Sequence, residues 1–424
     1  MDVIDKTILM VGFSCLPGAG SEPGVGWNWC IEAAKRSNVV FVTRSKHRDI
    51  LESAVPPELR DRLTFLYCDS SSALRKISIY FEYLDWQRRA FQTCRDYIEC
   101  HQVDAVWHIT WGTMIFPAKV LRLSVPTIWG PVGGGDLVPW EFLKQMPFRT
   151  RIVLTAKNLI IRSVPHMRYF RRQVRSATLV IARTSETEGM LGPLVGGKSE
   201  VRLETAFDSD SKVLSKQVSA LATGSNPRVA ELTSSVEVCC TNRLTSRKNV
   251  LFLIQAFAMA INMIPGLHLT IIGSGPEMGR IRSEVTRLNI EEYVSLVGEL
   301  PNEEVLECVA ASDIFAFPSL TEGGSWSLME AMALGKPIVC LDQSGMHEIC
   351  TEDCAQLVEV TTYSRTLQEY AEAIVELATN IELRAQKGAE ASNVIRTQHN
   401  RASQGEYIYD VLLRATRGQD QGCS

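Results

Sequence analysis

Two glutamates in the second half of the sequence stand eight positions apart, in the string TEGGSWSLMEAMALGKPIV, residues 321–339. Glu322 comes directly after a predicted strand, and Glu330 lies within the helix predicted to follow. Between them, Gly323 and Gly324 allow a tight turn, because glycine has no β-carbon in the way. The amides at such a helix start carry partial positive charge and bind phosphate. We therefore expect this turn to bind a diphosphate, with a carboxylate on each side suited to sugar and ribose hydroxyls.

A structural alternative exists for both glutamates. Ser327 and Glu330 match the capping-box pattern S-x-x-E, in which the glutamate only caps the helix start. Glu322 could be a solvated loop acid. The sequence around these two residues leaves both interpretations open.

A second string, TNRLTSRKN at residues 241–249, follows the predicted strand 236–240 and precedes a helix. Arg243 and Lys248 are therefore expected on a strand-end loop, where open α/β sheets bind their ligands. Two cations there can bind a diphosphate and neutralise its charge as it leaves. The alternative is a solvated basic turn, and Arg247 is predicted to be solvated in this way.

Together the two strings resemble the retaining glycosyltransferases of family four, with their R-x4-K and E-x7-E elements in order. The resemblance covers about 236–400, and the E-x7-E string within it ends in Gly335-Lys336-Pro337. It implies a GT-B architecture and a nucleotide diphosphate sugar as donor. It also implies that Glu322 is catalytic and contacts the transferred sugar, and that Glu330 holds the ribose. The implied donor-binding residues are Gly20, Arg243, Lys248, Gly323, Gly324, Ser325 and Glu330.

The pattern departs from the family at two places in this half. Gly324-Ser325 stand where Phe-Gly is frequent, and Ser344-Gly345-Met346 replace a frequent Gly-Gly-Pro. Both departures concern contacts with the donor sugar more than the fold.

The first half carries a glycine-rich loop and one histidine of interest. The loop LPGAGSEPGVGW, residues 16–27, is not a strict G-x-G-x-x-G, so a dinucleotide-binding dehydrogenase is a weak interpretation. By the resemblance, Gly20 approaches the donor phosphates, and Glu22 fixes the loop or touches the acceptor.

His108 ends a predicted strand, and the resemblance implies a catalytic position near the transferred sugar. A structural role is its alternative. The run GPVGGGD, 130–136, is similar to enzymes that build bacterial surface polysaccharides.

Short Val- and Ile-rich strands alternate with amphipathic helices along both halves. This alternation predicts an α/β protein with parallel sheets covered on both faces. We expect two doubly wound, Rossmann-like domains that face each other across a cleft. The predicted divisions are an acceptor-side domain 1–210, a linker 211–235, a nucleotide-sugar domain 236–400, and a C-terminal helix 401–424 that packs back on the first domain. The predicted strands are 7–11, 39–43, 105–109, 127–129, 236–240, 267–272, 314–317 and 338–341.

Composition excludes several classes of protein. The 424 residues are 45% hydrophobic and 22% charged, with a net charge of −4, so neither a disordered chain nor a nucleic-acid binder is expected. The 12 cysteines have irregular spacing without a paired C-x-x-C, which argues against a disulfide framework or a zinc site. We expect no metal site and no cofactor. No apolar run is long enough to span a bilayer, and a cytoplasmic location is expected.

The stretch 142–185 has no acidic residue and ten Lys or Arg, interleaved with apolar side chains. A basic amphipathic segment is a candidate for peripheral association with an anionic membrane at its inner face. The alternative is an ordinary surface helix pair whose cations face the acceptor or nucleic acid.

The expected function is transfer of a sugar to an acceptor hydroxyl with retention at the anomeric carbon. A lipid-linked saccharide in polysaccharide biosynthesis is the expected acceptor. Two alternatives are a nucleotide-sugar epimerase of the same architecture and a non-catalytic module that binds sugar nucleotides.

Overall fold

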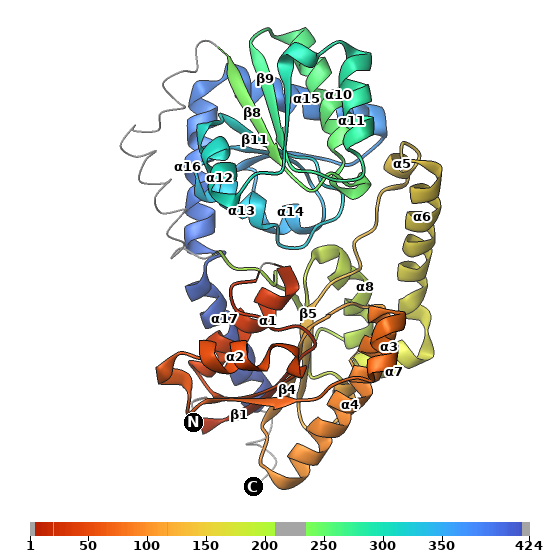
Figure 1. Ribbon diagram of the computed structural model, residues 1–424, viewed down its shortest axis with the longest axis vertical. Helices are drawn as coiled ribbons and strands as arrows, with labels where there is room; N and C mark the ends of the chain where they lie inside the picture. Colours follow the sequence, from red (N-terminus) through yellow and green to blue (C-terminus); the bar gives the residue numbers. More distant parts are fainter. Residues whose placement is uncertain (1–4, 20, 117, 208–234, 418–424) are drawn as a thin grey trace. The chain divides into compact units, whose positions relative to one another are not determined.

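A computed structural model describes residues 5–19, 21–116, 118–207 and 235–417. The chain divides into two compact units, of which the first comprises 1–136, 159–204 and 402–424, and the second 137–158 and 205–401. Each unit contains one fully parallel sheet with helices packed against it (Figure 1). The predicted linker 211–235 lies almost entirely outside the described residues, as does the predicted donor residue Gly20.

The sheet of the first unit has seven strands in the order β3-β2-β1-β4-β5-β6-β7. Its order reverses between β1 and β4, as in doubly wound folds. The strands are β1 (Thr7–Gly12), β2 (Asn38–Thr43), β3 (Leu63–Tyr67), β4 (Ala105–Thr110), β5 (Thr127–Val132), β6 (Leu179–Ala182) and β7 (Ser199–Val201). The α-helices that begin in this unit's segments or end in them are α1 (Ser21–Ala34), α2 (Arg48–Ala54), α3 (Ser72–Ile77), α4 (Ile79–Cys100), α6 (Phe148–Ser163), α7 (Arg168–Ser176), α8 (Ser185–Val195) and α17 (Arg401–Arg417).

The core of the first unit forms where α1 and α17 pack on the central strands. Trp29 of α1 meets Trp107 of β4 edge to face, with ring centroids 5.5 Å apart. The last helix, α17, buries Ile408, Val411 and Leu412 in the same cluster. The last described helix therefore packs in the same unit as β1.

The start of α1 differs from the predicted loop. The helix begins at Ser21, so Gly24 and Gly26 lie inside it and not in a loop. A β-carbon on Gly26 would stand 2.2 Å from the carbonyl oxygen of Ser14. These glycines therefore serve close packing of the helix on the preceding turn.

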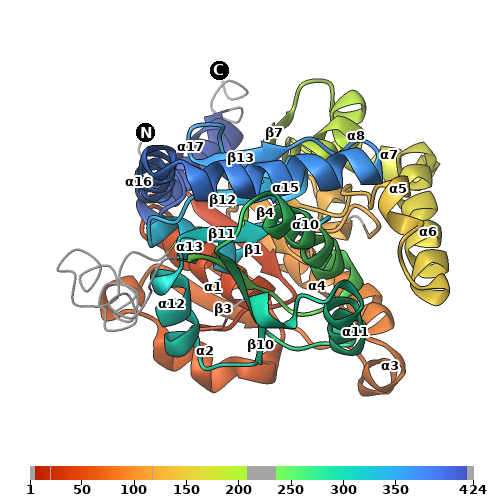
Figure 2. The same ribbon diagram turned by 90° about the horizontal axis from the view of Figure 1, so that it is seen from above.

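The sheet of the second unit has six strands in the order β10-β9-β8-β11-β12-β13. The strands are β8 (Val236–Thr241), β9 (Leu267–Ile272), β10 (Val294–Gly298), β11 (Ile314–Phe317), β12 (Ile338–Leu341) and β13 (Ala355–Val358). The α-helices are α5 (Trp140–Leu143), α10 (Val250–Met263), α11 (Met278–Leu288), α12 (Asn302–Ala311), α13 (Trp326–Ala333), α14 (Ser344–Ile349), α15 (Tyr363–Thr379) and α16 (Ile381–Thr397). Helices α10, α11 and α15 cover one face of the sheet, and α12 and α13 lie on the other (Figures 1 and 2).

Residues 137–158 belong to the second unit, which differs from the predicted boundary at 210. The reason is aromatic packing: the ring of Phe142 lies 5.3 Å from that of Phe252 in α10 and 5.2 Å from that of Tyr363 in α15. Phe142 is thereby fully buried in the core of the second sheet. The unit boundary then falls within α6.

Candidate functional site

The loop after β8 is held in a fixed path by the loop after β9. The amide of Leu244 donates to the carbonyl of Ser274 at 2.8 Å, and that of Asn242 donates to Ile272 at 3.0 Å. A β-carbon on Gly273, which has φ +134°, would stand 2.0 Å from the carbonyl oxygen of Asn242. Only glycine permits this approach without displacement. The turn 246–248 and α10 come next in the chain, after this fixed part of the loop.

The two predicted cations of this loop have different surroundings. Arg243 is exposed, and its guanidinium has no hydrogen-bond or ion-pair partner among the residues that the structure describes. Lys248 is largely buried and forms an ion pair with Glu322, its Nζ also lying 5.4 Å from the centre of the Phe317 ring. The structure therefore joins the R-x4-K loop to the first glutamate of the E-x7-E element.

The prediction that Arg247 is solvated is wrong. Its guanidinium donates to the carbonyl oxygen of Thr321 at 3.2 Å and to the Thr321 hydroxyl at 3.1 Å. The Arg247 carbonyl in turn accepts from the amide of Leu320 at 2.9 Å. Arg247 thus fastens the loop after β8 to the residues directly before Glu322.

The main chain of Glu322 is held by the start of α14. Its amide donates to the Ser344 hydroxyl at 3.0 Å, and its carbonyl accepts from the Gly345 amide at 2.9 Å. A β-carbon on Gly345 would stand 2.0 Å from the carbonyl oxygen of Gly323. Ser344, which departs from the family pattern, and Gly345 therefore support the turn that carries Glu322.

The turn through Gly323 and Gly324 leads into α13, whose N-cap is Ser325. The Ser325 side chain does not cap the helix, and its hydroxyl lies 3.2 Å from that of Ser327. The first amides of a helix have no partner within it, so those of α13 are available to another acceptor. A β-carbon on Gly324 would stand 1.5 Å from the Thr205 hydroxyl, which explains glycine at this position. This is the arrangement expected of a phosphate-binding turn.

Glu330 lies one turn into α13, and the capping-box alternative is wrong. The helix begins at Trp326, so Glu330 is too far along it to reach back to the N-cap Ser325. Its carboxylate has no hydrogen bond or ion pair among the described residues. Burial raises the pKa of this carboxyl to about 7. A mostly buried carboxylate with unused acceptor capacity suits a ligand that brings two hydroxyl donors.

His108 lies in β4 of the first unit and is 1% exposed. Its Nε2 lies 3.4 Å from the Tyr83 hydroxyl, and Nδ1 has no hydrogen-bond partner among the described residues. Burial lowers the pKa of the imidazole to about 3, so the ring is neutral at physiological pH. This environment agrees with a structural role, and the catalytic role stays a prediction.

The sequence did not point to a group of charged residues around Glu22 in the first unit. The Glu22 carboxylate accepts from the amide of Trp111, and Arg183 pairs with Glu204 at 3.0 Å. Burial raises the pKa of Glu22, and the nearby Arg183 guanidinium opposes that rise. A β-carbon on Gly133 would stand 2.2 Å from this guanidinium. Gly133 of the GPVGGGD run therefore makes room for Arg183, which is a signal that the sequence does contain.

Comparison with known proteins shows which proteins this chain is similar to. Residues 227–394 match the family profile described as Glycosyl transferases group 1. A GDP-mannose-dependent monoacylated alpha-(1-6)-phosphatidylinositol monomannoside mannosyltransferase of Corynebacterium glutamicum is 28% identical over 187 residues, which cover 42% of this chain and 48% of that protein. A putative colanic acid biosynthesis glycosyltransferase, WcaL of Escherichia coli, is 29% identical over 151 residues, 34% of this chain and 37% of that protein.

The matched stretches thus span about half or less of these relatives. The fold extends further: the crystal structure of HepE from Anabaena in complex with UDP superposes with a TM-score of 0.58 at 17% identity, covering 96% of this chain and 99% of that one. Residues 227–394 therefore resemble the glycosyl transferases group 1 family, within a two-unit chain that has the GT-B fold.

Proposed function

We propose that the chain is a retaining glycosyltransferase that moves a sugar from a nucleoside diphosphate sugar to an acceptor hydroxyl. The observation that carries the proposal is the Lys248–Glu322 ion pair beside the uncapped start of α13. A cation and free helix amides bind a diphosphate, and a carboxylate next to them can orient a sugar. The names of the relatives support surface-polysaccharide or glycolipid biosynthesis as the setting.

In the proposed reaction the bond between the anomeric carbon and the diphosphate oxygen breaks first. Arg243, Lys248 and the α13 amides neutralise the leaving diphosphate. The acceptor hydroxyl attacks the same face of the sugar, and its proton passes to the departing phosphate oxygen. Glu322 stabilises the positive charge that develops on the sugar. Glu330 holds the two ribose hydroxyls of the donor.

This chemistry needs no metal ion, because the cations and amides take over charge neutralisation. We therefore propose that neither a metal nor a cofactor takes part. Turnover is expected to persist in EDTA. If EDTA abolishes turnover and manganese restores it, the proposal of metal independence is contradicted. The proposed donor-binding site would not be affected by that result.

A thermal-shift screen of UDP and GDP sugars tests the donor. A ligand that binds the folded chain raises its Tm, so a donor is identified without knowledge of the acceptor. The relatives include one named as GDP-mannose-dependent and a structure with UDP, so both bases belong in the screen. Product that forms only when an acceptor saccharide is added separates the transferase from an epimerase.

We further propose that the acceptor is lipid-linked and that the chain associates peripherally with the inner face of the membrane. In the stretch 142–185, helix α6 exposes Phe148 (66%), Ile152 (51%) and Leu159 (62%). Their spacing places them along one side of the helix, among cations. Arg183 does not contribute to this surface, because it pairs with Glu204.

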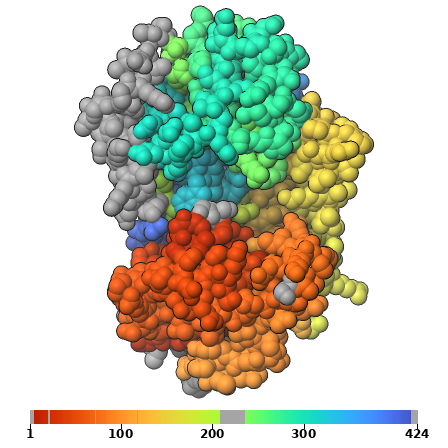
Figure 3. All heavy atoms as spheres, in the orientation of Figure 1, coloured from red at the N-terminus to blue at the C-terminus, as the bar shows by residue number. Residues whose placement is uncertain are grey.

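The junction of α3 and α4 supports the membrane proposal independently. Ile77, Tyr80 and Phe81 there are 67%, 57% and 54% exposed, next to the cations Arg75 and Lys76. In the space-filling view the orange segment containing α3 and the start of α4 forms part of the molecular surface (Figure 3). Apolar side chains with a cationic border favour an anionic lipid surface.

Among the described residues, no helix combines the length and apolarity needed to cross a bilayer. Flotation with vesicles that contain anionic lipid tests the surface association at low salt. Binding that weakens when Phe148 and Ile152 become serine supports it. Absence of binding would remove the membrane part and leave the transferase proposal in place.

A further inference from the structure

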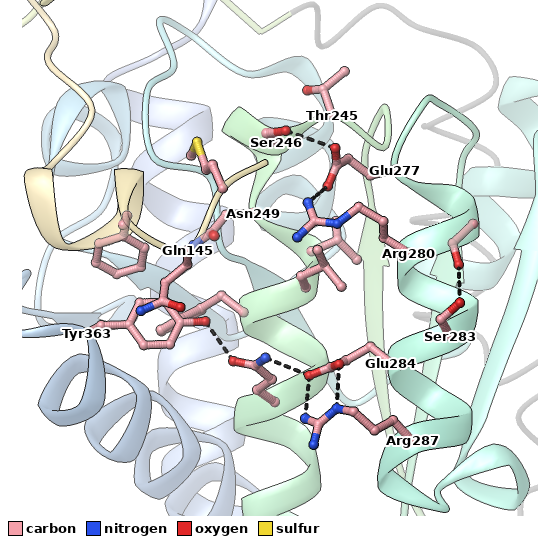
Figure 4. A pocket seen from close by; sticks show the side chains of 17 residues that line it. Gln145, Thr245, Ser246, Asn249, Glu277, Arg280, Ser283, Glu284, Arg287 and Tyr363 are labelled. Carbon is pink, nitrogen blue, oxygen red and sulfur yellow. Dashed lines mark hydrogen bonds and ion pairs between the residues drawn. The ribbon is translucent and has the colours of Figure 1, made fainter. Parts of the chain in front are cut away.

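A pocket of about 380 Å³ lies in the second unit, between the first turns of α10 and α15, the helix α11 and the short helix α5. Figure 4 shows Gln145 and Tyr363 on one side of it and the polar side chains of α11 on the other. The loop after β8 forms one wall through Thr245, Ser246 and Asn249. None of the residues predicted to bind the donor lines this pocket.

Charge in the pocket is balanced along α11. Glu284 accepts two hydrogen bonds from Arg287, at 2.8 and 2.7 Å, and Arg280 pairs with Glu277. The two carboxylates are nearly buried, whereas the two guanidinium groups are more exposed. Because each cation is matched by an adjacent anion, the pocket does not favour a phosphate or another anion. A neutral ligand fits it better.

Hydrogen-bonding capacity remains on the opposite side. The Asn249 Nδ2 is buried without a partner, and the Gln145 amide has no hydrogen bond among the described residues. Gln255 is fixed between the Tyr363 hydroxyl, at 2.7 Å, and Glu284, at 2.6 Å. Buried polar groups are normally satisfied, so the Asn249 amide indicates a missing acceptor.

The floor of the pocket is apolar and aromatic. Tyr363 presents its partly exposed ring there, over the buried rings of Phe142 and Phe252, with ring centroids 5.2 to 5.6 Å apart. A ligand that fits such a site has an apolar face for the Tyr363 ring and hydroxyls for the amides and ion pairs. A pyranose ring has this distribution, and the volume is near the lower end of small-molecule sites.

We propose that this pocket binds a neutral sugar unit at a site separate from the donor site. The sugar could be free or part of a saccharide chain, because the recognising chemistry is the same. The proposal does not depend on transferase activity. The pocket is connected to the proposed donor site through one short turn. Ser246 of this turn donates to Glu277 of the pocket at 2.9 Å, and Lys248 lies in the same turn.

Saturation-transfer NMR on the full chain tests the proposal with glucose, galactose, mannose and N-acetylglucosamine, and with their disaccharides. Glucuronic acid and glucose 1-phosphate are the anionic probes. We expect at least one neutral sugar to bind with a Kd on the order of 1 mM, and the anionic probes to bind at least about tenfold more weakly. A disaccharide that binds more tightly than its monosaccharide would identify a saccharide chain as the source.

Two variants locate the site. Gln145→Ala removes an exposed amide, and Asn249→Gly removes the buried amide while it keeps the left-handed backbone of that residue, φ 57°. Each is expected to weaken sugar binding at least about fivefold, since a lost hydrogen bond of about 1 kcal/mol has this effect. Gln102→Ala, an exposed glutamine of the first unit, is the matched control.

Lys248→Ala separates this inference from the donor proposal. Sugar binding that survives in Lys248→Ala and falls in Gln145→Ala places the sugar in the pocket. A signal that Lys248→Ala removes and Gln145→Ala leaves unchanged would place it at the donor site and overturn the inference. No neutral sugar signal up to the solubility limit would also overturn it.

Discussion

The ammonium group of Lys248 donates a hydrogen bond to Oε2 of Glu322, which joins the loop after β8 to the loop after β11. The two side chains are only 16% and 18% exposed. A partly buried pair is screened less by water than a surface pair, so it fixes both groups before any ligand arrives. The residue proposed to bind the diphosphate, Lys248, and the residue proposed to contact the sugar, Glu322, are thus held together before the donor binds.

Lys248→Ala should weaken donor binding by about tenfold to a hundredfold, which corresponds to roughly 1.4 to 2.8 kcal/mol. The substitution removes the cation that neutralises the diphosphate and leaves Glu322 without its partner. Calorimetric titration with UDP and GDP measures the change. Arg282→Ala, which removes an exposed cation of α11, is the matched control and should bind as the wild type does. Equal affinity in wild type and Lys248→Ala would contradict the assignment.

Glu322→Gln should separate binding from turnover. The amide keeps the size of the side chain and can still accept from Lys248, but it loses the charge that stabilises a cationic sugar. We expect donor affinity within about threefold of wild type and a loss of kcat of at least about a hundredfold, the size typical for removal of an electrostatic stabiliser. Single-turnover and titration measurements on the same preparation give both values. A variant with full turnover would show that Glu322 does not act in the reaction.

Much of the second unit could be predicted from the sequence, because short buried strands give local signals. The strands 267–272, 314–317 and 338–341 coincide with the observed β9, β11 and β12. The two glutamates also fall where the string 321–339 predicted, one on a strand-end loop and one in a helix.

What escaped prediction depends on contacts far apart in the chain. Arg247 bonds to Thr321, 74 positions away, and a basic turn gives no local sign of that partner. The membership of 137–158 in the second unit rests on Phe142 meeting Phe252. The edge strands β3, β7, β10 and β13 were not predicted, because each is short or only partly buried. Such strands carry a weaker hydrophobic pattern than central ones.

Gly345→Ala should destabilise the second unit and impair turnover together. An alanine β-carbon would stand 2.0 Å from the Gly323 carbonyl oxygen and 2.9 Å from that of Glu322, so the turn that carries Glu322 must move. Overpacking of this kind typically costs about 1 to 3 kcal/mol. Urea denaturation and kcat measure the two effects. Gly189→Ala in α8 is the control, since nothing lies within 4 Å of its β-carbon position, and it should stabilise slightly or change nothing. A Gly345→Ala variant as stable and active as wild type would contradict the described packing of this turn.

Glu330 should give the chain two opposite pH responses. Its pKa is raised from 4.5 to about 7, so the folded state retains a proton that the unfolded state loses. The stability contribution of Glu330 is therefore fully present below about pH 4.5 and is lost as pH rises to about 7, a loss of roughly 3 kcal/mol at most. Donor binding should change in the other direction, because only the ionised carboxylate accepts both ribose hydroxyls. We expect affinity to fall about tenfold between about pH 8 and about pH 6.

Glu330→Gln tests both responses, since glutamine does not titrate. Its melting temperature should exceed that of wild type at about pH 8 and approach it at about pH 5, in calorimetric scans without donor. Its donor affinity should be weaker than that of wild type at about pH 8 and nearly independent of pH. A fall in affinity between pH 8 and pH 6 of the same size in Glu330→Gln and wild type would assign the titration to another group. His108 would not be that group, because its pKa of about 3 leaves it neutral across this range.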